Sequence, residues 1–341
     1  MLPRLHLVHG PTPIVRRPAL DEIVGAEVWI KRDDTTGGAE AGNKLRKLEW
    51  LLADAIAKKA QAVITCGGLQ SNHARATALV CAQLGLSPFL LLRVPDPAKA
   101  KLPRTGNVLL DRMAGAHIHF VSPDEYRARS AVMEEARVGL AREGVNAYVI
   151  PEGGSNGLGS LGYVEAMREV REQMDLGLAG SLTRGSFPEP PGSFDVVAHA
   201  CGSGGTAAGV ALGAARWGVA REVWAFAVCD DRAYFEAATT RIINEARAYD
   251  TTLDGPTNLV IDDSAKGPAY AVMNDAQKAF LVRVTRATGL VLDPVYTGKA
   301  LYGVAKAVER GAIAKGARVL FLHTGGLPGL LAQGEDLEPA L

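Results

Sequence analysis

The sequence predicts an α/β protein built from mainly parallel sheets that are covered by helices. Two observations support this fold class. Short apolar runs of strand length alternate with longer stretches of helical periodicity along most of the 341 residues. Gly-rich segments stand at several junctions where an apolar run gives way to a helix, as in chains that pass from a parallel strand into a covering helix. A chain of this length can bury a substantial core, in one large or two ordinary domains.

The first expected strand covers residues 28–33. The helix that follows it begins near Lys44, because Leu45, Leu48 and Leu52 recur at helical spacing. Further strands are expected at residues 62–65, 89–92, 117–121, 147–150, 196–199, 222–228 and 318–322, and further helices at 74–84 and 206–217. Ligands of such sheets bind outside the carboxyl ends of the strands, so the residues that follow these runs are the candidates for function.

The charge balance argues against several classes of partner. Lysine plus arginine and aspartate plus glutamate both total 37, so no excess of charge predicts binding to nucleic acid or to an anionic membrane surface. The first residues lack the apolar run and cleavage site of a secretory signal. No apolar stretch reaches the roughly 18 residues that span a bilayer. We therefore expect a cytoplasmic protein.

The cysteines and histidines do not predict a metal site. The four cysteines are Cys66, Cys81, Cys201 and Cys229. They lack the Cys-x-x-Cys pairing of zinc and redox sites, and we expect them to be buried free thiols. His117 and His119 would share one face of a strand, but no third ligand accompanies them, so we interpret them as structural.

One segment departs from the strand and helix pattern. Residues 181–192 are rich in Pro, Gly and Ser and show no periodicity, which predicts a surface loop. Its place just before an expected strand is typical of a tolerated insertion, with a contact between subunits as the alternative.

The segment AGNKLRKLE, from Ala41 to Glu49, places a lysine where a Gly-Asn turn opens an amphipathic helix. Lys44 therefore lies at or near a strand-loop-helix junction. The positive end of the helix and the nearby Arg46 and Lys47 should favour loss of its proton, as Schiff-base chemistry requires. A solvated lysine at a helix start is the alternative that this segment alone leaves open.

The segment Gly202-Ser203-Gly204-Gly205-Thr206 lies between an apolar strand and a helix, as a phosphate-binding loop does. Glycines allow the backbone amides to approach an anion, the two hydroxyls add donors, and the helix contributes its positive end. The spacing matches neither a Walker loop nor the dinucleotide fingerprint. A tight turn without a ligand is the alternative.

Ser71-Asn72-His73 opens another helix, where Ser and Asn are ordinary N-cap residues worth about 1 kcal/mol. A helix start that carries a hydroxyl, an amide and an imidazole is also suited to binding a carboxylate. The same helix start can therefore be capped by its own side chains and also bind a carboxylate.

Taken together, these motifs resemble the D-cysteine desulfhydrase and 1-aminocyclopropane-1-carboxylate deaminase family, whose members are fold-type II pyridoxal-phosphate enzymes of amino-acid metabolism. The resemblance includes a fourth motif, Leu292 to Lys299 (LDPVYTGK), and runs from about Leu5 to about Leu331. It implies two domains with the cofactor in the cleft between them: a small one at 52–160, and a large one made of 1–51 and 161–341. It also implies a homodimer.

The resemblance assigns the cofactor-binding residues. Lys44 would carry pyridoxal 5′-phosphate as a Schiff base, and Asn43 or Asn72 would lie near its phenolic oxygen. Thr324, in the segment that ends the last expected strand, would bond the ring nitrogen. The phosphate would be held by Gly202, Ser203, Gly204, Gly205 and Thr206.

The resemblance also assigns the substrate-binding residues. Ser71, Asn72 and His73 would hold the substrate carboxylate. Tyr270 and Tyr296 would face the substrate and steer protons to the leaving group. The catalytic residues implied are Lys44, Ser71, Tyr270 and Tyr296.

Two positions favour the desulfhydrase branch over the deaminase branch. Thr297 stands where the deaminase branch has a glutamate, and His73 stands where it has a glutamine. A hydroxyl can donate to an unprotonated ring nitrogen, which suffices for a β-elimination that needs less carbanion stabilisation than opening a cyclopropane ring. Lys266 departs from the aromatic, Gly-rich pattern of the family, and either attracts an acidic substrate side chain or is solvated.

The expected reaction is therefore α,β-elimination from a small β-substituted amino acid. Freed Lys44 would remove the Cα proton, the β substituent would leave, and a 2-oxo acid and ammonia would form. D-cysteine, which gives pyruvate, ammonia and sulfide, is the first substrate to test. The alternatives are the deaminase reaction, which gives 2-oxobutanoate, and a catalytically idle protein that binds an amino acid or the cofactor. The preference for D or L substrates stays open.

Overall fold

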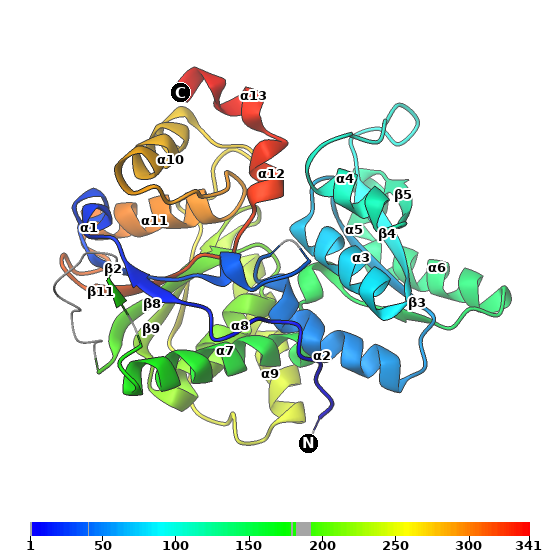
Figure 1. Ribbon diagram of the computed structural model, residues 1–341, viewed down its shortest axis with the longest axis horizontal. Coiled ribbons are helices and arrows are strands. Elements are labelled where there is room, and N and C mark those ends of the chain that lie inside the picture. Colours follow the sequence, from blue (N-terminus) through cyan, green and yellow to red (C-terminus); the bar gives the residue numbers. More distant parts are fainter. Residues whose placement is uncertain (1, 40, 179, 182–191) are drawn as a thin grey trace.

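The computed structural model describes residues 2–39, 41–178, 180–181 and 192–341. The chain forms two sheets, which lie in two parts of the molecule (Figure 1). The larger sheet has the strand order β10-β9-β8-β11-β2-β1-β7. Its strands are β1 (Ile14–Arg16), β2 (Glu27–Lys31), β7 (Gly180–Ser181), β8 (Phe194–Cys201), β9 (Ala220–Ala227), β10 (Leu259–Asp262) and β11 (Arg318–Leu322). All neighbours are parallel except β1 and β2.

The smaller sheet is wholly parallel and has the order β5-β4-β3-β6. Its strands are β3 (Ala62–Gly68), β4 (Ser87–Arg93), β5 (His117–Val121) and β6 (Ala147–Val149). The sheet lies on the right of Figure 1, among the cyan and green helices. All four strands fall inside the range 52–160, and we propose this range as the small domain.

Helices surround both sheets, and α2 (Lys44–Ala57) extends beneath the junction between the two parts (Figure 1). The helices around the smaller sheet are α3 (Asn72–Leu84), α4 (Gly106–Met113), α5 (Pro123–Arg127) and α6 (Arg129–Arg142). The others are α1 (Pro18–Val24), α7 (Gly157–Asp175), α8 (Gly205–Trp217), α9 (Arg232–Tyr249), α10 (Asp275–Thr288), α11 (Thr297–Glu309), α12 (Leu327–Leu331) and α13 (Gly334–Leu337). Short 3₁₀ turns occur at Asp33–Thr35, Glu152–Gly154 and Glu338–Ala340. Among the described residues, no helix combines the length and apolar character needed to cross a bilayer.

The predicted fold class is confirmed, and each expected strand coincides with an observed one. Three strands were not predicted: β1, β7 and β10, which have only two to four residues. Runs this short carry little periodicity, and of the strands with fewer than five residues only β6, with three, was predicted. The predicted surface loop at 181–192 lies almost wholly outside the described residues. His117 and His119 are exposed on β5, where His117 stacks on Phe89 with ring centroids 4.4 Å apart.

Close packing of helices fixes the position of α2. A Cβ atom added to Gly162 of α7 would lie 2.0 Å from the carbonyl oxygen of Arg46, inside any permitted contact. A Cβ atom on Gly209 of α8 would lie 2.2 Å from the carbonyl oxygen of Ser160. These glycines let α2, α7 and α8 approach closely, because no side chain separates their backbones.

A buried ionic network ties the first turn of α2 to the larger sheet. Arg46 donates to both carboxylate oxygens of Asp33 at 2.8 and 2.7 Å, and to both of Glu169 at 3.1 and 3.0 Å. Lys31 also donates to Glu169, and the hydroxyl of Tyr163 donates to Asp33 at 2.8 Å. Burial alone would raise the pKa of Asp33, but the Arg46 charge and hydrogen bonds hold it below its ordinary value. The network therefore stays ionised inside the protein.

Removing the arginine of this network should destabilise the fold. Arg46→Met leaves the Asp33 carboxylate buried without its main partner, so we expect the free energy of unfolding to fall by about 3–5 kcal/mol. Urea unfolding followed by far-UV circular dichroism measures this. Arg168→Met is the matched control, because Arg168 is on α7 and makes exposed pairs with Glu165 and Glu172, which should contribute less than about 1 kcal/mol. Equal losses in the two variants would contradict a structural role for the network.

Candidate active site

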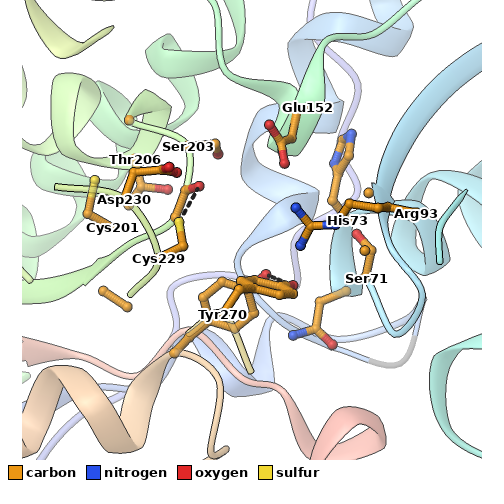
Figure 2. A pocket seen from close by; sticks show the side chains of 18 of the residues that line it. Ser71, His73, Arg93, Glu152, Cys201, Ser203, Thr206, Cys229, Asp230 and Tyr270 are labelled. Atoms are coloured by element: carbon orange, nitrogen blue, oxygen red, sulfur yellow. Dashed lines mark hydrogen bonds between the residues drawn. The ribbon is translucent and has the colours of Figure 1, made fainter. Parts of the chain in front are cut away.

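A cavity of about 1010 Å³ lies where the carboxyl ends of the two sheets face each other. Its wall includes residues that end or directly follow the parallel strands β3, β4, β8, β9 and β11, as expected for ligand sites in α/β proteins. Figure 2 shows side chains from both parts of the molecule converging on it. Of the residues proposed from the sequence, the wall contains Asn43, Lys44, Ser71, Asn72, His73, Gly202, Ser203, Gly204, Thr206, Tyr270, Tyr296 and Thr324. Gly205 lies just behind the wall, in the first turn of α8.

Lys44 is the first residue of α2, and the loop before it is held in a fixed shape. Gly42 has φ +115°, a conformation open to glycine, and its NH and carbonyl both bond the Thr36 hydroxyl, at 3.1 and 2.8 Å. The NH of Asn43 donates to the carbonyl of Thr324 at 3.2 Å. These bonds fix Lys44 beside the segment that follows β11.

The Lys44 amine is easier to deprotonate than a surface lysine. Burial lowers its pKa to about 8, and the carboxylate of Glu152 opposes part of that shift. The sequence argument attributed a low pKa partly to Arg46, but Arg46 is turned toward Asp33 and neutralised there. Burial is therefore the main cause. Among the described residues, no carboxylate forms an ion pair with Lys44.

The Gly-rich turn after β8 has the form of an anion cradle. Gly204 is the N-cap of α8 with φ +86°, and no side chain caps the helix. The amides of the first turn of α8 that follow Gly205 are therefore available to an anion. The hydroxyl of Ser155 lies 2.8 Å from that of Ser203 and accepts from the NH of Gly205 at 3.1 Å. Asn43 donates to Thr206 at 3.3 Å, which links the cradle to the Lys44 turn.

A second lysine, which the sequence analysis did not assign to the site, lies directly behind this cradle. The Lys47 side chain is buried, and its amine donates to the Gly153 carbonyl at 3.1 Å and to Ser155 at 3.3 Å. A Cβ atom on Gly205 would lie only 2.9 Å from that amine. Burial lowers the pKa of Lys47 well below its ordinary value, and a bound anion would offset that cost. Its spacing of three residues from Lys44, which puts both on one helix face, could have revealed it.

The start of α3 combines helix capping with an open polar surface. Ser71 accepts from the NH of Ala74 at 3.2 Å, so the capping interpretation is correct. The side-chain oxygen of Asn72 accepts from Asn107 at 3.0 Å, which holds its amide in the cavity wall. The backbone NH groups that begin the helix remain available for a carboxylate.

The hydrogen bonds around His73 argue against the carboxylate-binding role expected for its ring. Thr65 donates its hydroxyl proton to the Ile150 carbonyl, so Nε2 of His73, 2.9 Å from that hydroxyl, is the donor of their bond. Its Nδ1 is then an acceptor, buried without a protein partner. Burial and the charges of Lys44 and Lys47 hold the pKa of His73 well below its ordinary value. The neutral ring cannot donate from Nδ1 to a carboxylate.

Two tyrosines form a hydrogen-bonded pair on the cavity wall. The hydroxyl oxygens of Tyr270 and Tyr296 are 2.7 Å apart, and the rings meet edge to face. Burial raises the pKa of Tyr270 to about 12 and that of Tyr296 well above its ordinary value, so both hold their protons at neutral pH. The buried carboxylate of Asp293 accepts from the NH groups of Tyr296 and Thr297, at 2.9 and 2.8 Å, and so fixes the start of α11.

Thr297 and Lys266 lie outside the cavity wall, whereas Thr324 is part of it. The hydroxyl of Thr297 donates to Asp293 at 2.6 Å and is fully buried. Lys266 contributes its carbonyl, which accepts from the amine of Lys299 at 2.6 Å. Thr324 is therefore the hydroxyl available to a ligand at the end of β11.

Several further residues of the wall come from the smaller sheet and its helices, and sequence reasoning did not identify them. Arg129 pairs with Glu152 at 2.9 Å, and the Tyr126 hydroxyl donates to the same carboxylate. Arg93, the last residue of β4, also faces the cavity. Its position directly after the expected strand at 89–92 was a usable signal. Cys201, at the end of β8 in the larger sheet, lies in the wall as well, and burial raises the pKa of its thiol to about 12, so the thiol keeps its proton at neutral pH.

Comparison with known proteins gives a consistent result. A family model described as "Pyridoxal-phosphate dependent enzyme" matches residues 5–325. The mitochondrial bifunctional D-cysteine desulfhydrase/1-aminocyclopropane-1-carboxylate deaminase of Arabidopsis thaliana is 41% identical over 330 residues, which cover 95% of this chain and 78% of that protein. The D-cysteine desulfhydrase of Klebsiella pneumoniae is 36% identical, over 97% of this chain and 96% of that protein. A crystal structure of an ACC deaminase homologue superposes with a TM-score of 0.84 at 34% identity, covering 100% of this chain and 97% of that one.

The cavity suits pyridoxal 5′-phosphate. An uncapped helix start backed by a buried lysine fits its phosphate, a half-buried lysine of lowered pKa fits its aldehyde, and a free hydroxyl at the end of β11 fits its ring nitrogen. When bound, the cofactor supplies an electron sink for charge that develops at a substrate Cα.

Lys47 should contribute to cofactor affinity through the phosphate alone. Lys47→Met removes a buried cation behind the cradle, so we expect the dissociation constant of pyridoxal 5′-phosphate to rise about tenfold or more, as for loss of a charge-assisted hydrogen bond. Binding of pyridoxal, which lacks the phosphate, should change little. Equilibrium dialysis measures both. Lys58→Met, which follows the same helix and is exposed, is the control. An equal loss for both ligands would mean that Lys47 acts on the fold and not on the phosphate.

Proposed function

Because this chain belongs to the family of pyridoxal-phosphate dependent enzymes, we propose that it is a carbon-sulfur lyase of the D-cysteine desulfhydrase type. The proposed reaction converts D-cysteine and water into pyruvate, ammonia and hydrogen sulfide. The observation that carries the proposal is the position of Lys44. Its amine shares one cavity with an anion cradle, the start of α3 and a pair of protonated tyrosines.

Each group has a proposed task in this reaction. The cradle and Lys47 hold the cofactor phosphate, and the start of α3 holds the substrate carboxylate. Lys44 would hold the cofactor, and its amine takes the proton from the substrate Cα. Its pKa of about 8 gives a useful fraction of neutral amine near pH 7. Tyr270 and Tyr296 retain their protons at that pH and hold one ready for the departing sulfur.

The deaminase reaction is the second candidate function. The Arabidopsis relative carries both activities in its name, so the family allows either reaction on one scaffold. Thr297 favours the desulfhydrase, because its hydroxyl is hydrogen-bonded to Asp293, which leaves the hydroxyl of Thr324 to serve the ring nitrogen. A neutral hydroxyl does not impose a protonated pyridine, which ring opening requires more than β-elimination does. A catalytically idle binding protein would need neither the buried amine nor the paired tyrosines.

We also propose that the protein is a homodimer in the cytoplasm. The support is the resemblance to the family, together with the absence of a global charge excess. The expected partner is a small amino acid, without nucleic acid or a membrane.

The first test is spectroscopic and catalytic. We expect the purified protein to absorb between roughly 410 and 430 nm through its lysine-bound cofactor, and Lys44→Ala to lose that band. Lys58→Ala, at the residue that follows α2, is the control. Persistence of the band in Lys44→Ala would remove the Schiff-base assignment.

The substrate is tested with a panel read out as pyruvate or 2-oxobutanoate. It contains D- and L-cysteine, D- and L-serine, β-chloroalanine, cysteate and 1-aminocyclopropane-1-carboxylate. We expect pyruvate from D-cysteine. Formation of 2-oxobutanoate from the cyclopropane amino acid alone would favour the deaminase, and no turnover of any β-substituted alanine would exclude the lyase.

Capture of the cofactor by the protein stripped of it should depend on pH through Lys44. Only the neutral amine attacks the aldehyde, and its fraction grows about tenfold per pH unit below the pKa. With a pKa of about 8, the rate constant should rise from pH 6.5 and level off just above pH 8. Stopped-flow absorbance measures it. A rise that continues to pH 10 would show that Lys44 has an ordinary pKa.

A further inference from the structure

Arg93 is a cation in the cavity to which the proposed reaction gives no role. It ends β4, where its backbone pairs with Gly68 of β3 and its side chain is partly buried. The guanidinium lies over the ring of Tyr126 at 4.9 Å and over that of Tyr270 at 5.6 Å. Figure 2 shows the side chain reaching into the cavity near Ser71. Two aromatic rings thus orient the guanidinium while its donors stay open.

The other cations around the cavity are already engaged. Arg129 pairs with Glu152 at 2.9 Å, and Arg127 pairs with Asp124 at the exposed rim. Lys47 is behind the cradle. For the guanidinium of Arg93, by contrast, the described part of the chain provides neither an ion-pair partner nor a hydrogen-bond acceptor. An unpaired guanidinium fixed in a cleft is suited to binding an anion.

The position of Arg93 indicates which part of a substrate it would meet. It borders the start of α3, where the substrate carboxylate is proposed to bind, and it stands beside Tyr270, whose ring lies 3.0 Å from where a Cβ on Gly68 would be. With the carboxylate at α3 and the amine toward Lys44, we expect the β substituent of one enantiomer to face the tyrosine pair and Arg93. The exposed carboxylate of Asp230 lies across the cavity, on the cradle side (Figure 2). Because it is on the opposite side, it does not neutralise the positive charge of Arg93.

We propose that Arg93 binds the β substituent of the substrate and selects amino acids whose leaving group carries or develops a negative charge. The inference rests on the proposed function, since it names the substrate class of the same site. In the elimination, the Cα–H bond breaks with its proton passing to Lys44, and a Cα=Cβ double bond forms. The Cβ–X bond breaks with its electron pair leaving on X. Arg93 contacts X as a thiolate or another anion, and a neutral X gains nothing from it.

Aspartate and asparagine form the probe pair, because they have nearly the same shape, differ in charge at the β substituent, and carry no leaving group. Their D and L forms are titrated against the cofactor-loaded protein by calorimetry. For the better-bound enantiomer, we expect aspartate to bind about tenfold or more tightly than asparagine, as for one charge-assisted contact. Equal affinities, or tighter asparagine, would overturn the proposal.

Substitutions of Arg93 distinguish loss of its contact with the anion from a general disturbance of the fold. Arg93→Gln should remove the preference for aspartate, and Arg93→Lys should retain part of it, because the charge stays but the fork geometry is lost. Arg127→Gln, a loss of the same charge at the exposed rim, should leave the preference unchanged. An undiminished preference in Arg93→Gln, or an equal loss of affinity for both ligands, would overturn the assignment. The second result would place Arg93 at the α-carboxylate instead.

This test can fail independently of the proposed function. If the protein turns over no β-substituted alanine yet prefers aspartate through Arg93, the lyase proposal fails and the anion site stands. If the protein eliminates sulfide from cysteine while aspartate and asparagine bind with equal affinity, the lyase proposal is supported and the proposed role of Arg93 is wrong.

Discussion

The bidentate pairing of Arg46 with both Asp33 and Glu169 is the constraint on which the site depends. It joins the turn after β2, the first turn of α2 and the middle of α7. Burying these charges is costly unless every donor and acceptor is satisfied, and here Lys31 and Tyr163 complete the set. Arg46 is two residues after Lys44, and residues two apart on a helix point to nearly opposite sides. Fixing Arg46 against the larger sheet therefore turns Lys44 toward the cavity.

Side chains of the first turns of α2 point in three directions, and each group has a different role. Arg46 anchors the helix, Leu45 and Leu48 enter a core shared with α7 and α8, and Lys44 and Lys47 face the cavity and its cradle. This arrangement explains why two lysines three residues apart behave alike. Both lose the stabilisation of water, and burial is the main cause of the lowered pKa of each. Such a pair is costly in an empty cavity and becomes favourable once an aldehyde and a phosphate are bound.

Much of the fold and of the candidate site could be predicted from the sequence. The features that could not be predicted have physical reasons. Apolar runs predicted every strand of five or more residues and the shorter β6. The rule that ligands lie at the carboxyl ends of parallel strands predicted that distant motifs meet at one edge. The partners of Arg46 could not be found this way, because Glu169 is 123 residues away and only the fold brings it near. The tautomer of His73 depends on where Thr65 directs its proton, which no local pattern encodes. Arg93 was overlooked because a single arginine after a strand belongs to no motif.

The two sheets contribute different chemistry to the cavity. The larger sheet supplies the anion cradle and Thr324, whereas the smaller one supplies the start of α3 and Arg93. The backbone of Arg93 belongs to the β3 and β4 ladder, which forms whatever side chain stands there. Exchange of that side chain would therefore alter what the cavity selects without disturbing the cradle or Lys44. Specificity at this edge is separable from cofactor binding because the two depend on different sheets, joined through α2 and its buried arginine.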